Sequence, residues 1–149
     1  MMLQNNFAIK YAAFHRDIKR RSYQNLNRNF LSTYEKGISA ERIASKMLIS
    51  RGYEILGQRI RTGYGEIDIL AKKENDVVAV EVKQRKTLEA AKCCIPLRQR
   101  RRIFDAISFI ASERNKPFEN YRVDVICFDA VGRFEHIENA FSVENLVAC

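Results

Sequence analysis

The sequence predicts a single α/β domain in which helices flank a mixed β-sheet, and two observations lead to this expectation. The chain has 149 residues, 46% of them apolar, which suits one folded domain with a substantial core. Short runs rich in Ile and Val, typical of strands, occur between stretches with helical periodicity. We expect this domain at residues 31–149, after a basic extension at residues 1–30.

The first predicted helix covers residues 31–51. Its apolar residues recur at the spacing of one helix face: Ala40, Ile43, Ala44, Met47 and Leu48. Gly52 follows at the place where a glycine commonly ends a helix. Residues 53–61 then have the pattern of a first strand. Gly63 and Gly65 come next, in a loop that suits either a neighbouring phosphate or a plain turn.

The central feature of the sequence is a predicted hairpin with strands at residues 63–71 and 77–85. Asp68, Glu81 and Lys83 interrupt its apolar runs. A half-buried strand does not accept unpaired charges cheaply, so these three residues are expected to act together.

The length of the turn decides which of these charges meet. If Lys73 pairs with Asp76 across an even-numbered turn, Asp68 lies directly opposite Glu81 on one face of the sheet. Facing carboxylates repel, and a divalent cation such as Mg²⁺ or Mn²⁺ between them removes the repulsion. Lys83 then shares the face of Glu81 and can reach a phosphate oxygen or a water. This arrangement suits metal-assisted hydrolysis of a phosphodiester.

The spacing of these residues resembles a known signature. Asp68, twelve residues and then Glu81-Val-Lys83 resemble the PD-(D/E)XK nuclease pattern. The longer combination of Gly-Glu-Ile-Asp at 65–68 and Val-Glu-Val-Lys-Gln-Arg at 80–85 resembles the YraN family of small bacterial proteins. That family is similar to archaeal Holliday-junction resolvases.

The resemblance covers roughly residues 35–142. It implies a restriction-endonuclease-like fold with the three charged hairpin residues as its catalytic group. In the family, the helix before the sheet carries a Gly-Glu pair; here Ala40 replaces the glycine and Glu41 matches the glutamate. The resemblance therefore implies that Glu41 is a further catalytic residue and metal ligand, whereas the residues alone leave an ordinary solvated glutamate open.

A second helix is predicted after Pro96. Its apolar face holds Ile103, Ala106, Ile107, Ile110 and Ala111, and its first turns hold Arg98, Arg100, Arg101 and Arg102. Positive charges at this end oppose the helix dipole, which suggests a functional reason for them. Because free N–H groups and arginines together attract anions, we expect these arginines and Arg85 to contact DNA phosphates. A solvated basic face is the alternative.

The rest of the domain is predicted with less detail. Residues 86–95 are expected to form a mobile connection, and residues 121–128 another strand. Asp124 lies inside that strand and is expected to be structural, paired with an arginine or with the backbone. Gly132 marks a turn into a short edge strand at residues 133–137.

Charge and composition narrow the partners. The net charge is +8 and the pI is about 9.5, which favours a polyanion, with nucleic acid first. No apolar run approaches the roughly 18 residues of a membrane span, and no secretory signal is visible. The four cysteines lack a Cys-x-x-Cys pair, so reduced thiols in the cytoplasm are expected. Residues 1–30 suit an upstream extension, a basic arm, a membrane-surface helix or a transit-like segment.

Two functions compete on this sequence. In the first, the protein is a Mg²⁺-dependent endonuclease that acts on DNA, including branched or damaged DNA, and a homodimer would suit duplex cleavage. In the second, it binds nucleic acid without catalysis. The carboxylates at Asp68 and Glu81 favour the first function, because binding alone does not need them.

Overall fold

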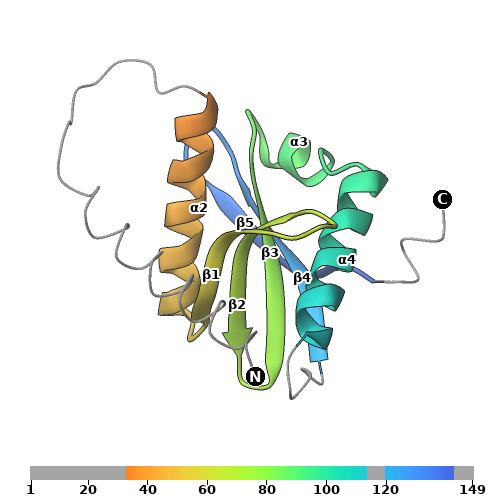
Figure 1. Cartoon of the computed structure of the whole chain (residues 1–149). Helices are drawn as coiled ribbons and strands as arrows, with labels where there is room; N and C mark the ends of the chain where they lie inside the picture. Colours follow the sequence, from red (N-terminus) through yellow and green to blue (C-terminus); the bar gives the residue numbers. More distant parts are fainter. Residues whose placement is uncertain (1–32, 114–119, 143–149) are drawn as a thin grey trace. The chain divides into compact units, whose positions relative to one another are not determined.

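Five strands form one sheet, and helices cover both of its faces (Figure 1). The computed structural model describes residues 33–113 and 120–142. The strands are β1 (Glu54–Arg61), β2 (Glu66–Lys73), β3 (Asp76–Gln84), β4 (Asn120–Phe128) and β5 (Phe134–Phe141). The helices are α2 (Thr33–Ser50), α3 (Leu88–Lys92) and α4 (Leu97–Ser112). The predicted basic extension at residues 1–30 lies outside the described residues.

The sheet is mixed. Its strand order follows the sequence, from β1 to β5. Strands β3 and β4 pair in parallel, and the other three neighbouring pairs are antiparallel. Because a parallel pair needs a long crossover, α3 and α4 occupy the connection between β3 and β4. This is the predicted α/β fold with a mixed sheet flanked by helices, and it is consistent with a restriction-endonuclease-like fold.

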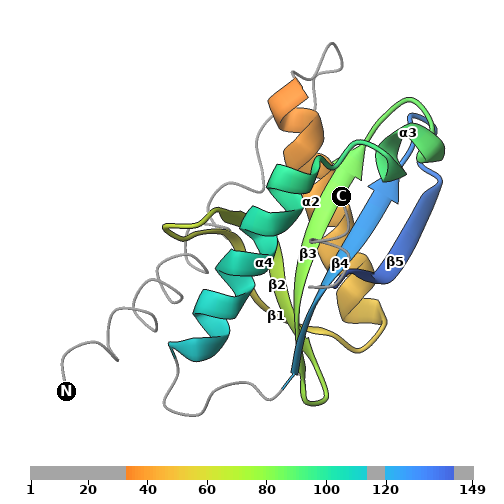
Figure 2. The ribbon, with the colours of Figure 1, turned by 90° about the vertical axis from the view of Figure 1, so that its right-hand side faces the viewer.

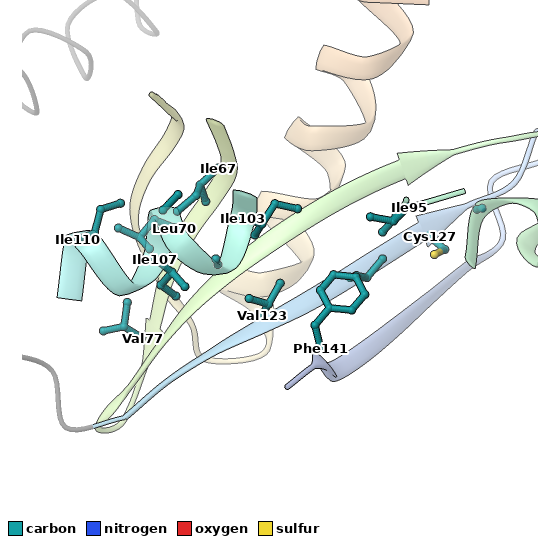
Figure 3. Packing of buried hydrophobic residues seen from close by; sticks show 14 residues of the cluster. Ile67, Leu70, Val77, Ile95, Ile103, Ile107, Ile110, Val123, Cys127 and Phe141 are labelled. Atoms are coloured by element: carbon teal, nitrogen blue, oxygen red, sulfur yellow. The ribbon is translucent and has the colours of Figure 1, made fainter. Parts of the chain in front are cut away.

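Each face of the sheet has its own core, shown from a second direction in Figure 2, where α4 lies in front of the sheet and α2 behind it. The α4-side core includes Ile67, Leu70, Val77, Ala79, Val123, Val125, Ile103, Ala106, Ile107 and Ile110. The α2-side core includes Ile69, Ala71, Val78, Val80, Ile126, Phe128, Ala40, Ala44 and Leu48. Figure 3 shows Ile103, Ile107 and Ile110 of α4 packed beside Ile67 and Leu70 of β2. The predicted apolar face of α4 is confirmed.

Helix α2 ends as its sequence predicts. Gly52 has φ of 83°, a left-handed conformation that glycine adopts without strain. The Gly52 N–H donates to the carbonyl of Ile49, and the Tyr53 N–H donates to that of Leu48, both at 3.0 Å. These two bonds satisfy carbonyls that the helix end would leave open, as in a Schellman motif.

Two segments differ from the sequence expectation, the connection after β3 and the last strand. The segment expected to be a mobile connection contains α3, because Thr87 caps it: its side chain accepts a hydrogen bond from Ala90 N at 3.1 Å. The last strand, expected at residues 133–137, extends from Phe134 to Phe141. It pairs with β4 along this length, with an irregularity between Val123 and Val125, so the longer strand follows from tertiary pairing.

Asp124 is structural, as predicted. It is fully buried in β4, and its carboxylate accepts hydrogen bonds from Arg122 Nε at 2.9 Å and from Asn139 N at 2.9 Å. His136 Nε2 lies 2.8 Å from its other oxygen. Burial alone would raise the pKa of Asp124, but the bonds from His136, Arg122 and Asn139 outweigh burial and lower it.

None of the helices in the described part of the chain has the length and apolarity needed to cross a bilayer.

Candidate active site

The site is built where β2 and β3 separate. Their ladder begins at Lys73 opposite Asp76 and ends at Ile69 opposite Val80. Beyond that point β2 continues only along β1, and β3 continues along β4. The predicted turn and register are therefore confirmed over the whole observed ladder, which stops one residue short of Asp68 and Glu81. We call the place where the strands diverge the fork.

Asp68 satisfies the backbone that the fork leaves open. Its Oδ2 accepts a hydrogen bond from Val82 N at 2.8 Å, so a side chain takes the place of a strand partner. This bond brings the Asp68 carboxylate across to β3, beside Glu81. After burial, the neighbouring Asp68 carboxylate is the largest cause of the raised pKa of Glu81. The two predicted site residues thus meet at the fork.

Glu81 is 3% exposed, and two other residues fix its carboxylate. Gln99 Nε2 donates to Glu81 Oε1 at 2.7 Å, from the first turn of α4. Lys83 Nζ forms an ion pair with the same oxygen, and the Lys83 side chain is only 16% exposed. A buried carboxylate needs such partners, because desolvation of an unpaired charge costs several kcal/mol. The attraction to a well-placed positive charge offsets a similar amount.

Three carboxyl groups at or near the fork, those of Glu81, Asp68 and Glu41, have raised pKa values. Burial is the largest cause for Glu81, whose pKa rises to about 7, and the neighbouring Asp68 adds to it while Lys83 opposes it. Burial also raises the pKa of Asp68 itself, against the hydrogen bond from Val82. On α2, burial and then Asp68 raise the pKa of Glu41 to about 7, against the charge of Arg59. The fork therefore favours a bound proton or cation.

A cavity of about 600 Å³ opens between the fork and the N-terminus of α4. Its lining residues are Gly65, Glu66, Asp68, Glu81, Lys83, Pro96, Arg98, Gln99, Arg102 and Ile103. Pro96 precedes α4 without a side-chain cap on the first N–H groups. The cavity thus combines one buried carboxylate, two half-buried carboxylates, one ammonium, two arginines and a helix N-terminus, which is a setting for an anion held beside a cation.

The predicted arginines do not form one surface. Arg98 and Arg102 line the cavity, but Arg100 does not. Its Nε donates to the Ile95 carbonyl at 2.9 Å, and its guanidinium lies 5.0 Å from the centre of the Phe141 ring. Arg85 is exposed at the end of β3, where Nη1 donates to the Gln84 carbonyl, and Arg101 is exposed on α4 outside the cavity lining.

Glu41 lies on α2, which packs against the opposite face of the sheet from α4. It is half-buried and is not among the residues that line the cavity. Besides burial, Asp68 and Glu66 raise its pKa and Lys83 opposes them, so the charge of Glu41 is coupled to the site. Among residues 33–113 and 120–142, no three His, Cys, Asp or Glu side chains are arranged to hold a metal ion.

Sequence reasoning missed Gln99 as a site residue. It considered the first turns of α4 for charge, and a neutral amide between arginines carries no such signal. A signal existed in the periodicity: Gln99 lies four residues before buried Ile103, so it continues the face of α4 that packs on the sheet. A polar residue on that face, one turn before the core, has to find a buried polar partner.

Arg59 was also missed. It has φ of 50°, which is uncommon for a residue other than glycine, and it lies on β1 opposite Asp68, between the pairs Gln58–Ile69 and Ile60–Ile67. Here the face alternation of β2 breaks, because Ile67 joins the α4-side core and Ile69 the α2-side core. Arg59 Nη2 lies 3.3 Å from Glu66 Oε1. Burial is the main cause of the raised pKa of Asp68, and the positive charge of Arg59 partly opposes that rise.

The fold and the site define an α/β protein with two carboxylates and a lysine at the fork of a mixed sheet. The model of "Uncharacterised protein family UPF0102" matches residues 40–128, which include all of these site residues. The chain therefore belongs to the UPF0102 family, and this supports the resemblance to the YraN family.

Individual relatives agree with this assignment. A UPF0102 protein of Granulibacter bethesdensis is 41% identical over 109 residues, which cover 72% of this chain and 69% of that protein. A UPF0102 protein of Nitrobacter winogradskyi is 36% identical over 113 residues, 74% of this chain and 95% of its own length. One of Azorhizobium caulinodans is 36% identical over 114 residues, 76% of this chain and 87% of its own.

Proposed function

We propose that this protein is a metal-dependent nuclease that hydrolyses phosphodiester bonds in DNA, including branched or damaged DNA. The observation that carries the proposal is the meeting of Asp68 and Glu81 at the fork, on the wall of a cavity that also bears Lys83. A binding surface for nucleic acid does not need buried carboxylates with raised pKa values, because they repel phosphate. A divalent cation that assists hydrolysis, by contrast, is held by carboxylates placed side by side in this way.

The donor set fits a hard cation. Asp68 and Glu81 offer carboxylate oxygens, the ligands that Mg²⁺ and Mn²⁺ prefer, and leave room in the cavity for water and phosphate oxygens. These two residues would hold the ion, with Glu41 as a third carboxylate whose charge is coupled to that of Asp68. When bound, such an ion polarises a phosphoryl oxygen and lowers the pKa of a coordinated water.

The remaining residues have separate tasks in this proposal. Gln99 orients the Glu81 carboxylate through its 2.7 Å hydrogen bond. Lys83 brings a positive charge to the cavity wall, where it orients the attacking water and stabilises negative charge that develops on the phosphoryl group. Arg98, Arg102 and the N-terminus of α4 bind the phosphates of the substrate.

A cleavage assay tests the proposal. Linear, flapped and four-way DNA are incubated with the protein and Mg²⁺, Mn²⁺ or EDTA. Cleavage is expected with the ions and not with EDTA. Lys83→Ala is expected to lower the rate at least about a hundredfold while DNA binding persists, because its interaction is made mainly in the transition state. Lys46→Ala, an exposed lysine on α2, is the matched control and should cut as the parent does.

One observation favours the second candidate function, nucleic-acid binding without catalysis. In the described residues no third ligand joins Asp68 and Glu81, and Lys83 already neutralises Glu81. If no DNA or RNA is cut with either ion while DNA still binds, the binding function replaces the nuclease. If Lys83→Ala cuts as fast as the parent protein, the assignment of the fork as the active site is wrong.

A further inference from the structure

Two exposed aromatic side chains lie beside the cavity, and the proposed chemistry uses neither of them. Tyr64, in the loop between β1 and β2, is 51% exposed, and Phe109, on α4, is 38% exposed. Their ring centres are 5.5 Å apart and their planes are tilted by 50°. Single exposed apolar side chains are common in folded domains, but these two rings form one contiguous exposed patch beside the candidate site, and patches of this kind mark interaction sites.

The loop holds Tyr64 in a fixed position. The Thr62 hydroxyl accepts hydrogen bonds from the N–H groups of Tyr64 and Gly65, both at 3.1 Å, and donates to the Gly65 carbonyl at 2.9 Å. Arg102 Nε on α4 donates to the Tyr64 carbonyl at 3.0 Å. A side chain at Gly65 would come within 3.3 Å of the Arg102 backbone, so the loop also approaches α4 closely. The backbone of Tyr64 is therefore tied down while its ring remains in solvent.

This position continues the wall of the cavity. Gly65, the next residue in the chain, lines the cavity, and so does Arg102, which bonds to Tyr64. On α4, Arg98, Arg102 and Phe109 follow one another at i, i+4 and i+11, a spacing that keeps them on one stripe of the helix. A chain of phosphates bound by Arg98 and Arg102 would thus carry its next base towards the exposed rings. Positive charge followed by an exposed aromatic ring is the combination that binds single-stranded nucleic acid.

We propose that Tyr64 is a stacking platform for an unpaired nucleobase that flanks the phosphate bound in the cavity, with Phe109 supporting the tyrosine ring from α4. This inference rests on the proposed function and names its substrate class: nucleic acid with an unpaired segment, such as a flap, a gap or the arm of a branch. A continuous duplex cannot use the platform, because its base faces are covered by their stacked neighbours.

The chain contains no tryptophan, so the platform can carry its own reporter. Tyr64→Trp introduces one indole at the proposed stack. A single-stranded oligonucleotide should quench its fluorescence, and an abasic oligonucleotide with the same number of phosphates should not. Tyr121→Trp is the matched control. Tyr121 is 37% exposed and packs on Phe104 at 5.7 Å in a similar pair, but its chain neighbours Asn120 and Arg122 do not line the cavity, whereas Gly65, next to Tyr64, does. Its fluorescence should not respond to either oligonucleotide.

Binding measurements complete the test. Tyr64→Ala should weaken binding of the base-bearing oligonucleotide about tenfold and leave the abasic one unchanged. Tyr64→Phe should bind as the parent does. Tyr64→Leu keeps an apolar contact with Phe109 but offers no aromatic face, so it should also lose binding, and its melting temperature checks that the fold is intact.

The outcomes separate the platform from the nuclease. If Tyr64→Leu loses no affinity, or loses it equally for both oligonucleotides, the platform is wrong and the proposed function stands. Equal quenching by the abasic oligonucleotide also overturns the platform. If the parent protein binds neither oligonucleotide nor any duplex, the proposed function fails, and the platform, which rests on it, fails with it.

Discussion

At the scale of single residues, the buried ion pair of Glu81 and Lys83 is not explained by the stability of the fold, because desolvation of the two charges offsets their attraction. Both side chains are largely buried, and a hydrophobic pair of similar volume commonly stabilises a fold as well or better. Glu81 also has Asp68 beside it, a second carboxylate whose pKa is raised. Buried ionisable groups with shifted pKa values are typical of functional sites, where they bind a ligand or take part in the chemistry.

Metal binding should therefore stabilise the fold, and the effect should depend on pH. Glu81 has a folded-state pKa of about 7 against an ordinary value of 4.5. A carboxyl group with a raised pKa contributes stability below about 4.5 and loses it as the pH rises through about 7. Mg²⁺ replaces the lost protons, so at pH 8 a saturating concentration should raise the melting temperature by about 5 °C or more, and at pH 5 by much less.

Thermal melts at the two pH values measure this effect. Asp68→Asn should remove most of the response to Mg²⁺, because it deletes one of the two carboxylates at the fork. Glu89→Gln, an exposed carboxylate on α3, should respond to the ion as the parent does. An equal response in parent and Asp68→Asn would place the ion elsewhere.

At the scale of elements, the N-terminus of α4 presents only part of its basic charge to the cavity. Arg98 and Arg102 line the cavity, whereas Arg100 packs over Phe141 and bonds to Ile95. A helix exposes successive residues about 100° apart, so neighbouring arginines necessarily point in different directions. The net charge of a segment therefore overstates the number of phosphates that it contacts.

Arg98→Ala and Arg100→Ala should consequently have different effects. Arg98→Ala should weaken binding to all DNA sequences and reduce the slope of log K against log salt by about 1, the share of one phosphate contact. Arg100→Ala should leave that slope unchanged and lower the melting temperature, because it loses a packing and hydrogen-bond contact. Affinities measured over a series of salt concentrations test both variants. Equal slopes in the two variants would show that packing does not divide the arginines in this way.

The elements also show where sequence reasoning succeeds and where it stops. The register of the hairpin was predictable because side chains alternate with a period of two, and any even-numbered turn gives the same alignment of Asp68 and Glu81. The end of α2 was predictable because Gly52 suits a left-handed conformation. Local rules of this kind need only neighbouring residues, and they held.

Features that depend on the packing of distant segments were not predictable. Arg59 takes a left-handed conformation in the middle of β1, where nothing in its neighbours indicates one. The direction of Arg100 depends on Phe141, a residue in β5. The contact of Gln99 with Glu81 exists only because α4 packs against β3 at that height. The chemistry of the site was thus visible in sequence, and its geometry had to come from the fold.

At the scale of the whole molecule, a second group of charges joins the sheet on its α2 side. Arg122 of β4 is its centre, with hydrogen bonds to Asp76 Oδ2 of β3 at 3.0 Å and to the hydroxyl of Tyr53 before β1 at 3.0 Å. Asp124 joins β4 to β5 through His136 and Asn139. These bonds connect segments far apart in the sequence. Loss of the Asp124 carboxylate should therefore destabilise β4 and β5 together.

The donor and acceptor roles of the two His136 ring nitrogens follow from its neighbours. Arg51 Nη1 lies 3.2 Å from His136 Nδ1, and a guanidinium can only donate, so Nδ1 accepts and Nε2 carries the hydrogen. Nε2 then donates to Asp124 at 2.8 Å. The Asp124 carboxylate therefore receives donors on both oxygens and remains ionised, in keeping with its lowered pKa.

Asp124→Asn should destabilise the protein by about 3–5 kcal/mol at neutral pH, because it leaves buried donors without a matching charge. The pKa of Asp124 lies below its ordinary value of 3.8, so its stabilisation is present above about pH 3.8 and disappears as the pH falls through the lowered pKa. The difference in urea midpoint between parent and variant should therefore be large at pH 7 and shrink below about pH 4. Glu138→Gln, an exposed partner of Arg122 at 3.4 Å, should cost less than about 1 kcal/mol at either pH. A difference for Asp124→Asn that stays constant from pH 7 to pH 3 would mean that lost packing, and not lost charge, accounts for the destabilisation.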